Sequence, residues 1–167
     1  AGNLTPDPET GLGTWSLDAF RRALHEGRSR DGRLLYPAFP YVHFTRLSEG
    51  DVTALWAHLR ALPPVRQPDT AHALRFPYNT QAALALWRVL FFEPGRFEPD
   101  ATRSAEWNRG AYLVNGVAHC AACHGTRNAW GATSDAFGGE HLPDGRWYAP
   151  SLHDPVSYTH LTLPTSD

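Results

Sequence analysis

The sequence predicts an all-α protein with long ordered loops between its helices. Four segments repeat apolar residues at helical spacing, and no segment alternates apolar and polar residues cleanly over the length of a strand. The 14 prolines and 14 glycines fall mostly between the helical segments, where they favour turns. Apolar residues make up 42% of the 167 residues and charged residues 19%, which is a globular composition. Long ordered loops are unusual in a small domain unless another group fills its core.

The first half of the chain is expected to hold two helices. The first covers 16–27, because Ser16 suits an N-cap, apolar residues follow at i, i+3 and i+7, and Gly27 suits the C-terminal cap. Two prolines exclude a long helix from 28–47, whose aromatic residues indicate a partly buried, ordered loop. The second helix covers 48–62, where a serine–x–x–aspartate start precedes an apolar face and two prolines end it.

The second half is expected to hold two more helices. Residues 63–78 carry four prolines and no sustained period, which is typical of a linker. A third helix is expected over 80–92. A fourth begins near Ser104 and is expected to run directly into Cys120. Beyond that helix the chain is rich in glycine, proline and aromatic residues, and neither a helix nor a strand is expected there.

The net charge and the lengths of the apolar runs indicate which classes of partner the sequence gives no reason to expect. Fifteen basic and 17 acidic residues give a net charge of −2, which provides no electrostatic reason to expect a nucleic-acid partner. No apolar run approaches the ~18 residues of a membrane-spanning helix. The chain begins with Ala rather than Met, so its natural start is expected to be missing. Three histidines, His25, His58 and His72, are expected to be solvated and receive no role.

The strongest chemical signal is the step Cys120-Ala-Ala-Cys123-His124. Two thiols separated by two residues match the spacing of the vinyl groups of a porphyrin, and the histidine that follows can bind the iron. The pattern therefore indicates covalent attachment of haem c at Cys120 and Cys123, with His124 as an iron ligand.

Other interpretations of the same residues stay open at this point. The two cysteines could form a redox-active dithiol, although no strand precedes them as that interpretation expects. They could also form half of a zinc site with nearby histidines, namely His119, His124, His141 and His153. A haem peroxidase-like enzyme is a further alternative, and it needs an open iron site with polar catalytic residues.

Four residues near the motif are candidate partners for the buried propionates of a haem, which need hydrogen-bond donors. They are Arg127, Asn128, Trp147 and Tyr148. The alternative is that these loop residues pack on one another.

The flanks of the motif resemble the multi-haem cytochrome c subunits of bacterial periplasmic dehydrogenase complexes. These include the cytochrome subunits of alcohol and gluconate dehydrogenases, and those paired with molybdenum hydroxylases that oxidise nicotinate or related N-heterocycles. The resemblance covers about residues 2–155. It rests on ordered stretches in both halves of the chain: NLTPDPETGLGTW, DGRLLYPAFPY, the expected helix 48–62, FPYN, LWRVLFFEPG, NRGAYLV, HCAACH, Arg127-Asn128 and WYAP.

The resemblance implies repeated cytochrome c-like haem domains, both incomplete in this chain. Residues 1–62 are expected to form the distal half of a first haem domain, and 63–103 a linker with one helix. Residues 104–155 are expected to form the proximal half of a second haem domain. Residues 156–167 do not resemble the family and are expected to be a non-native tail.

The resemblance also implies electron transfer rather than oxidation of the organic substrate. Electrons are expected to enter from the catalytic subunit of a periplasmic dehydrogenase and to leave towards a quinone or a terminal oxidase. One haem c site is complete in this chain, and a second haem is implied upstream. The parent protein is expected in the periplasm, attached to the inner membrane.

One departure from the family concerns the iron ligand of the upstream haem. Many relatives place Met where this sequence has Phe39, and the chain contains no Met at all. Phe cannot bind iron, so that haem is expected to be five-coordinate or to use another side chain. His43 is the nearest candidate, because imidazole is a common iron ligand. The alternative is that His43 is a partly exposed loop residue.

Overall fold

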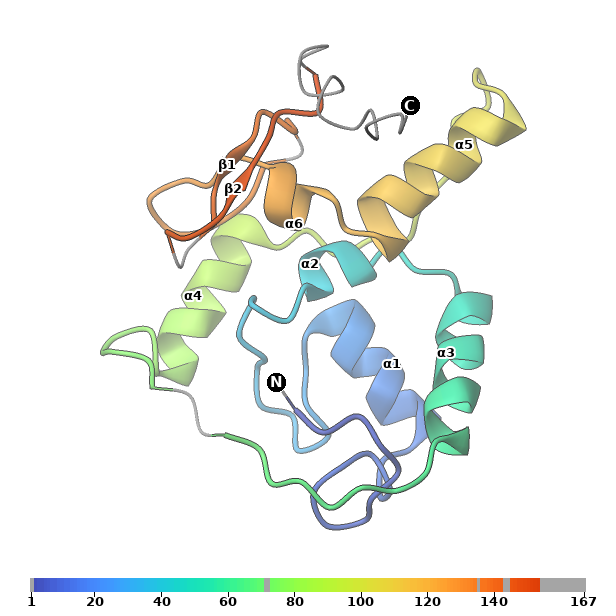
Figure 1. The fold of residues 1–167 in the computed structure, drawn as a ribbon, viewed down its shortest axis with the longest axis vertical. Coiled ribbons are helices and arrows are strands. Elements are labelled where there is room, and N and C mark those ends of the chain that lie inside the picture. Colours follow the sequence, from blue (N-terminus) through green and yellow to red (C-terminus); the bar gives the residue numbers. More distant parts are fainter. Residues whose placement is uncertain (1, 71–72, 135, 143–144, 154–167) are drawn as a thin grey trace, which may run out of the picture. The chain divides into compact units, whose positions relative to one another are not determined.

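The computed structural model of the chain is mostly helical and forms two compact units, Ala1–Asp100 and Ala101–Asp167 (Figure 1). The structure describes residues 2–70, 73–134, 136–142 and 145–153. The helices are α1 (Leu17–Glu26), α2 (Tyr41–Phe44), α3 (Glu49–Ala61), α4 (Gln81–Phe91), α5 (Ala105–Tyr112) and α6 (Ala121–His124), with a π-helical segment η1 (Leu113–Val117) after α5. The strands are β1 (Glu140–His141) and β2 (Tyr148–Ala149).

The three helices predicted before residue 100 are confirmed close to their expected bounds, as α1, α3 and α4. Each begins with a hydroxyl side chain that accepts a backbone N–H of the first turn: Ser16, Ser48 and Thr80. Such caps satisfy donors that the helix itself leaves unpaired. Gly27 ends α1 in the left-handed conformation, with φ at 57°, as the sequence predicted.

The core of the first unit lies where α1 packs against α2 and α3. Its buried apolar side chains are Leu12, Ala19, Phe20, Ala23, Leu24, Tyr41, Leu47, Val52, Leu59 and Leu84. Tyr41 is fully buried, and the edge-to-face contact of its ring with Phe92 places the two ring centres 5.0 Å apart. The segment that follows α3 is joined to the N-terminal loop, because Asn3 donates a hydrogen bond to the carbonyl of Val65.

The short helix α2 was not predicted from the sequence. Residues 28–47 are an ordered, partly buried segment as expected, but Pro40 is followed by one helical turn. Four residues cannot show an apolar period, so sequence patterning could not reveal this turn.

His25 contradicts the expectation that it is solvated, because only 3% of its surface is exposed. Burial lowers the pKa of His25, and the positive charge of Arg96 lowers it further. Its Nδ1 atom lies 3.9 Å from the carboxylate of Glu49, at the start of α3. His58 is exposed as expected, and His72 lies outside the described residues.

The helix predicted to run unbroken from Ser104 into Cys120 is instead interrupted. It begins as α5, widens into the π-helical segment η1, and ends at His119, whose φ is 42°. The segment LVNGV contains two β-branched valines, an asparagine and a glycine, all weak helix formers. The wider turn keeps the backbone paired, since the N–H of Ala118 donates to the carbonyl of Leu113 over 2.7 Å.

The expectation of no strand after the motif was also wrong. Strands β1 and β2 pair antiparallel, with Glu140 opposite Ala149 and His141 opposite Tyr148. Strands of two residues are too short to show alternation in the sequence. The predicted tail at 156–167 lies outside the described residues, and the domain boundaries expected at residues 62 and 103 stay predictions. No helix in the described part of the chain is long and apolar enough to cross a membrane.

Candidate functional site

The cysteine–histidine motif forms the single helical turn α6. The carbonyl of His119 accepts the N–H of Ala122 over 2.8 Å, and the carbonyl of Cys120 accepts the N–H of His124 over 2.9 Å. Residues three apart on a helix lie on one face, so this turn brings the two cysteines onto the same side. Both thiols are free, with Cys120 half-buried and Cys123 exposed.

The left-handed backbone of His119 separates α6 from the preceding helix. His, like Asn and Asp, occupies this conformation more often than other non-glycine residues do. The N–H of Cys120 donates to the carbonyl of Val114 over 3.1 Å, which ties the start of the motif back to η1. The sharp turn at His119 therefore sets the direction in which Cys120 leaves the helix.

The ring of His124 is fixed by a hydrogen bond to the chain beyond strand β2. Its Nδ1 atom lies 2.8 Å from the carbonyl oxygen of Pro150. A carbonyl oxygen can only accept, so Nδ1 carries a proton, and in the neutral ring Nε2 then keeps its lone pair. This is the state in which a histidine binds a metal, with its other ring nitrogen oriented by a backbone carbonyl.

The β1–β2 hairpin holds His124 from two directions. The N–H of Gly139, just before β1, donates to the carbonyl of His124 over 2.9 Å, while Pro150 follows β2 and accepts from the ring. Gly139 has φ at 78°, and a Cβ atom at this position would lie 2.5 Å from the backbone nitrogen of Ser151. Only glycine fits this close approach. Neither Gly139 nor Pro150 was predicted to act here, although the pair Gly138-Gly139 was an available turn signal.

Arg127 is the predicted propionate donor that the structure brings to the motif. One of its guanidinium nitrogens, Nη2, donates to the carbonyl of Ala122 inside the motif. The other, Nη1, is buried without a hydrogen-bond partner and lies 4.0 Å from the carboxylate of Glu140. A buried donor without a partner is costly, so Nη1 is suited to an anionic group that enters the site.

The other three predicted donors lie in the same unit, in different surroundings. The side-chain oxygen of Asn128 accepts the backbone N–H groups of Trp130 and Ala132, and so closes a turn. Trp147 and Tyr148 are 69% and 57% exposed. The Tyr148 ring lies 5.0 Å from the ring of His141 across the hairpin. Their roles toward a haem stay predictions.

The residues present fit a covalently held haem. The turn α6 supplies two free thiols, His124 supplies its Nε2 atom, and Arg127 supplies a buried donor without a hydrogen-bond partner. This unit also exposes large apolar side chains that a porphyrin could cover: Trp107, Val117, Trp130, Trp147 and Tyr148. A structural zinc site fits less well, because no three His, Cys, Asp or Glu side chains gather for a metal among the described residues.

The other predicted iron ligand, His43, lies in helix α2 of the first unit. It is 5% exposed, which contradicts its interpretation as a partly exposed loop residue. The ring of Phe39 packs edge-on against Phe44 with ring centres 5.6 Å apart. A role for His43 as iron ligand stays a prediction.

A Cys-x-x-Cys-His step is the pattern of c-type haem attachment. In this structure it forms one helical turn, and its histidine ring contacts a backbone carbonyl. Comparison with known proteins agrees, although no family model matches the chain. One of the subunits of nicotinate dehydrogenase from Pseudomonas putida is 51% identical over 154 residues, which cover 90% of this chain and 13% of that protein. The cytochrome c subunit of the quinone-dependent alcohol dehydrogenase of Gluconacetobacter polyoxogenes is 38% identical over 92% of this chain and 35% of its own length. A dihaem c-type cytochrome of Cereibacter sphaeroides is 35% identical over 90% of this chain and 51% of its own length.

The homologues of this chain thus include cytochrome c subunits of alcohol and gluconate dehydrogenases, as the resemblance predicted. Their relationship to this chain supports electron transfer through covalently bound haem c. The chain spans between 13% and 51% of the length of these three relatives, so it corresponds to a segment of each.

Proposed function

We propose that this chain transfers electrons through a haem c bound covalently at Cys120 and Cys123, with His124 as the proximal iron ligand. The observation that carries the proposal is the hydrogen bond from Nδ1 of His124 to the carbonyl of Pro150. That bond holds the imidazole in the tautomer that binds iron. It also joins a motif residue to a segment 26 residues further along the chain.

Haem iron supplies a one-electron ferric–ferrous couple, and the chain's residues bind the group and control access to it. The backbone groups of Gly139 and Pro150 hold His124, and the Nη1 atom of Arg127, which has no hydrogen-bond partner, is suited to an anionic substituent. Cys123 is exposed, which places one thioether position at the surface of this unit. A surface-accessible edge favours electron exchange with a partner protein.

The partner in this proposal is the catalytic subunit of a periplasmic dehydrogenase, and the electrons leave towards a quinone or a terminal oxidase. The names of the relatives support a dehydrogenase partner. The parent protein is proposed to lie in the periplasm, attached to the inner membrane, because haem c is attached outside the cytoplasm. A second haem domain upstream agrees with the dihaem name of one relative.

The test is an oxidation–reduction cycle of the chain after expression with a haem c maturation system. Dithionite should give a sharp reduced α-band, and a water-soluble quinone added in excess should restore the oxidised spectrum. Reversible one-electron behaviour in an optical titration is the expected result. A colourless chain, or a chain whose main activity is turnover of peroxide, would contradict the proposal.

The ligand of the upstream haem gives a separate prediction. In a protein that includes that haem, His43→Ala should convert the iron from six-coordinate low-spin to high-spin, because a buried imidazole ligand is lost. Magnetic circular dichroism would show the change. His58→Ala, which alters an exposed histidine, is the matched control. An unchanged spectrum for His43→Ala excludes this residue as ligand. A near-infrared Met–Fe(III) band assigned to that haem would show that its iron has a Met ligand, against the expectation from Phe39.

A further inference from the structure

Resting on the proposed function, we infer that Glu140 is a positioning residue of the haem site. It acts through Arg127: it holds this arginine against the motif turn, and its negative charge lowers the reduction potential of the iron. No pattern in the sequence singles out Glu140. Its partner, Arg127, lies 13 residues earlier in the sequence, across the loop that follows the motif.

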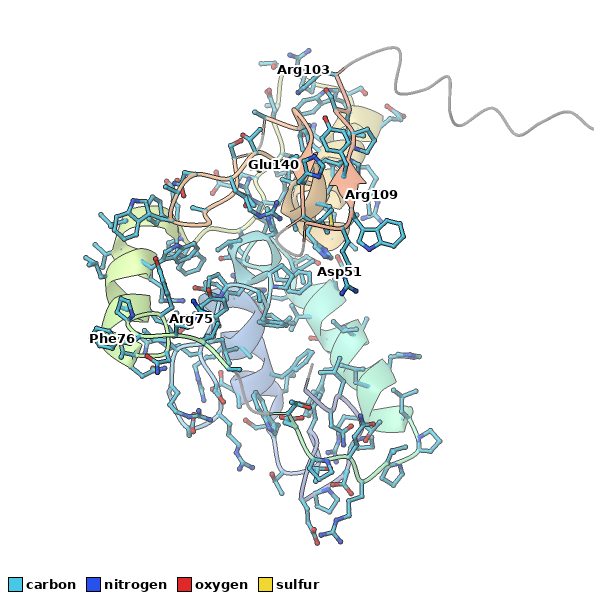
Figure 2. The ribbon with its side chains drawn as sticks, turned by 60° about the vertical axis from the view of Figure 1, so that its left-hand side comes forward. Asp51, Arg75, Phe76, Arg103, Arg109 and Glu140 are labelled. Atoms are coloured by element: carbon cyan, nitrogen blue, oxygen red, sulfur yellow. The ribbon has the colours of Figure 1, made fainter. Side chains whose placement is uncertain are left out.

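Two consecutive contacts connect the hairpin to the motif, from Glu140 to Arg127 and from Arg127 to Ala122. Glu140 is the first residue of β1, and Figure 2 labels its side chain at the strand pair. Its carboxylate accepts the backbone N–H of Arg127 and lies 4.0 Å from Nη1 of the same residue. Arg127 in turn donates through Nη2 to the carbonyl of Ala122, between the two cysteines. One carboxylate thus fixes both the backbone and the side chain of the residue that touches the motif.

The hairpin geometry makes this arrangement specific to Glu140. Its neighbour Gly139 donates to the carbonyl of His124, and its cross-strand partner Ala149 precedes Pro150, which accepts from the His124 ring. The side chain of Glu140 therefore starts from a backbone already fixed to the proximal histidine. Both side chains are shielded, with Arg127 17% and Glu140 34% exposed.

The charge of this carboxylate has a definite effect on the iron. Oxidation adds a positive charge to the iron, so a nearby carboxylate stabilises the ferric state and lowers the potential. The partly shielded position weakens screening by water and salt. The positive charge of Arg127 raises the reduction potential, so the two opposite charges of Arg127 and Glu140 partly offset each other beside the motif.

The experiment compares Glu140→Gln with Glu106→Gln in the haem-loaded chain. Both variants remove one negative charge from the same unit, but Glu106 lies exposed in the first turn of α5. Glu140→Gln should raise the reduction potential more than Glu106→Gln does, and Glu140→Asp, which keeps the charge, should restore part of the wild-type value. Equal potentials for the two glutamine variants would overturn the inference.

A second measurement uses the chain without haem and follows the backbone N–H of Arg127 by nuclear magnetic resonance. Loss of the charged acceptor in Glu140→Gln should move this proton resonance upfield, with no such change in Glu106→Gln. An unchanged resonance would show that the contact is not formed and would overturn the inference. A wild-type chain that attaches no haem overturns the proposed function instead, and this outcome is separate from the resonance shift.

Discussion

Replacing both Cys120 and Cys123 by Ala is expected to abolish covalent haem attachment completely. The two thiols lie on one helical turn, and they are the only cysteines in the chain. Without them no thioether bond can form, so any haem that remains is held by His124 alone and is removed by acid–acetone extraction. Intact mass spectrometry should show the loss of one haem mass in the double variant, whereas each single variant can keep one thioether.

The matched control keeps both thiols and removes the iron ligand. His124→Ala should retain a covalently attached haem but lose the low-spin visible spectrum, because the proposal assigns the proximal nitrogen to the ring that contacts Pro150. The two variants therefore separate attachment from ligation. A double cysteine variant that still carries haem after extraction would show that another residue binds the group covalently.

Gly27→Ala is expected to destabilise the first unit strongly. Gly27 is left-handed at the end of α1, and a Cβ atom there would lie 2.6 Å from the ring of the fully buried Tyr41. The left-handed conformation costs an alanine about 1–2 kcal/mol, and forcing a methyl group into a packed core adds about 1–3 kcal/mol. A loss of about 3 kcal/mol is large against a typical unfolding free energy of about 5–15 kcal/mol. Urea unfolding followed by circular dichroism measures the change.

Gly32→Ala is the control for this prediction. Gly32 also has a positive φ, of 84°, but a Cβ atom there would meet nothing within 4 Å. Its substitution should cost only the backbone term, about 1–2 kcal/mol. The difference between the two variants isolates the contact with Tyr41. Equal losses would mean that the ring of Tyr41 does not pack against Gly27 as described.

The local features of this fold could be predicted because neighbouring residues determine them. Ser16, Ser48 and Gly27 mark helix ends by side-chain capping or by backbone freedom, which depend on only a few residues. The motif at Cys120 and Cys123 is equally local, since the spacing of the two thiols on one helical turn is enough to indicate haem attachment. For these features the sequence is sufficient.

The parts that could not be predicted depend on contacts distant in sequence. Pro150 orients the His124 ring across 26 residues, and Glu140 reaches Arg127 across 13 residues. No period or spacing in the sequence indicates such pairs. The burial of His25 could not be predicted for the same reason, because it depends on segments that lie well beyond its own helix. The interruption at η1 coincides with weak helix formers. The apolar period of the segment continues through them, so it predicts an unbroken helix.

The most direct test of the haem c assignment is the haem content of the chain after expression with a haem c maturation system. We predict one haem per chain, measured by the pyridine haemochrome spectrum, and a matching mass increase that survives acid–acetone extraction. A chain with no added mass, or one whose haem is fully extracted, would contradict the assignment of Cys120, Cys123 and His124 as a haem c attachment site.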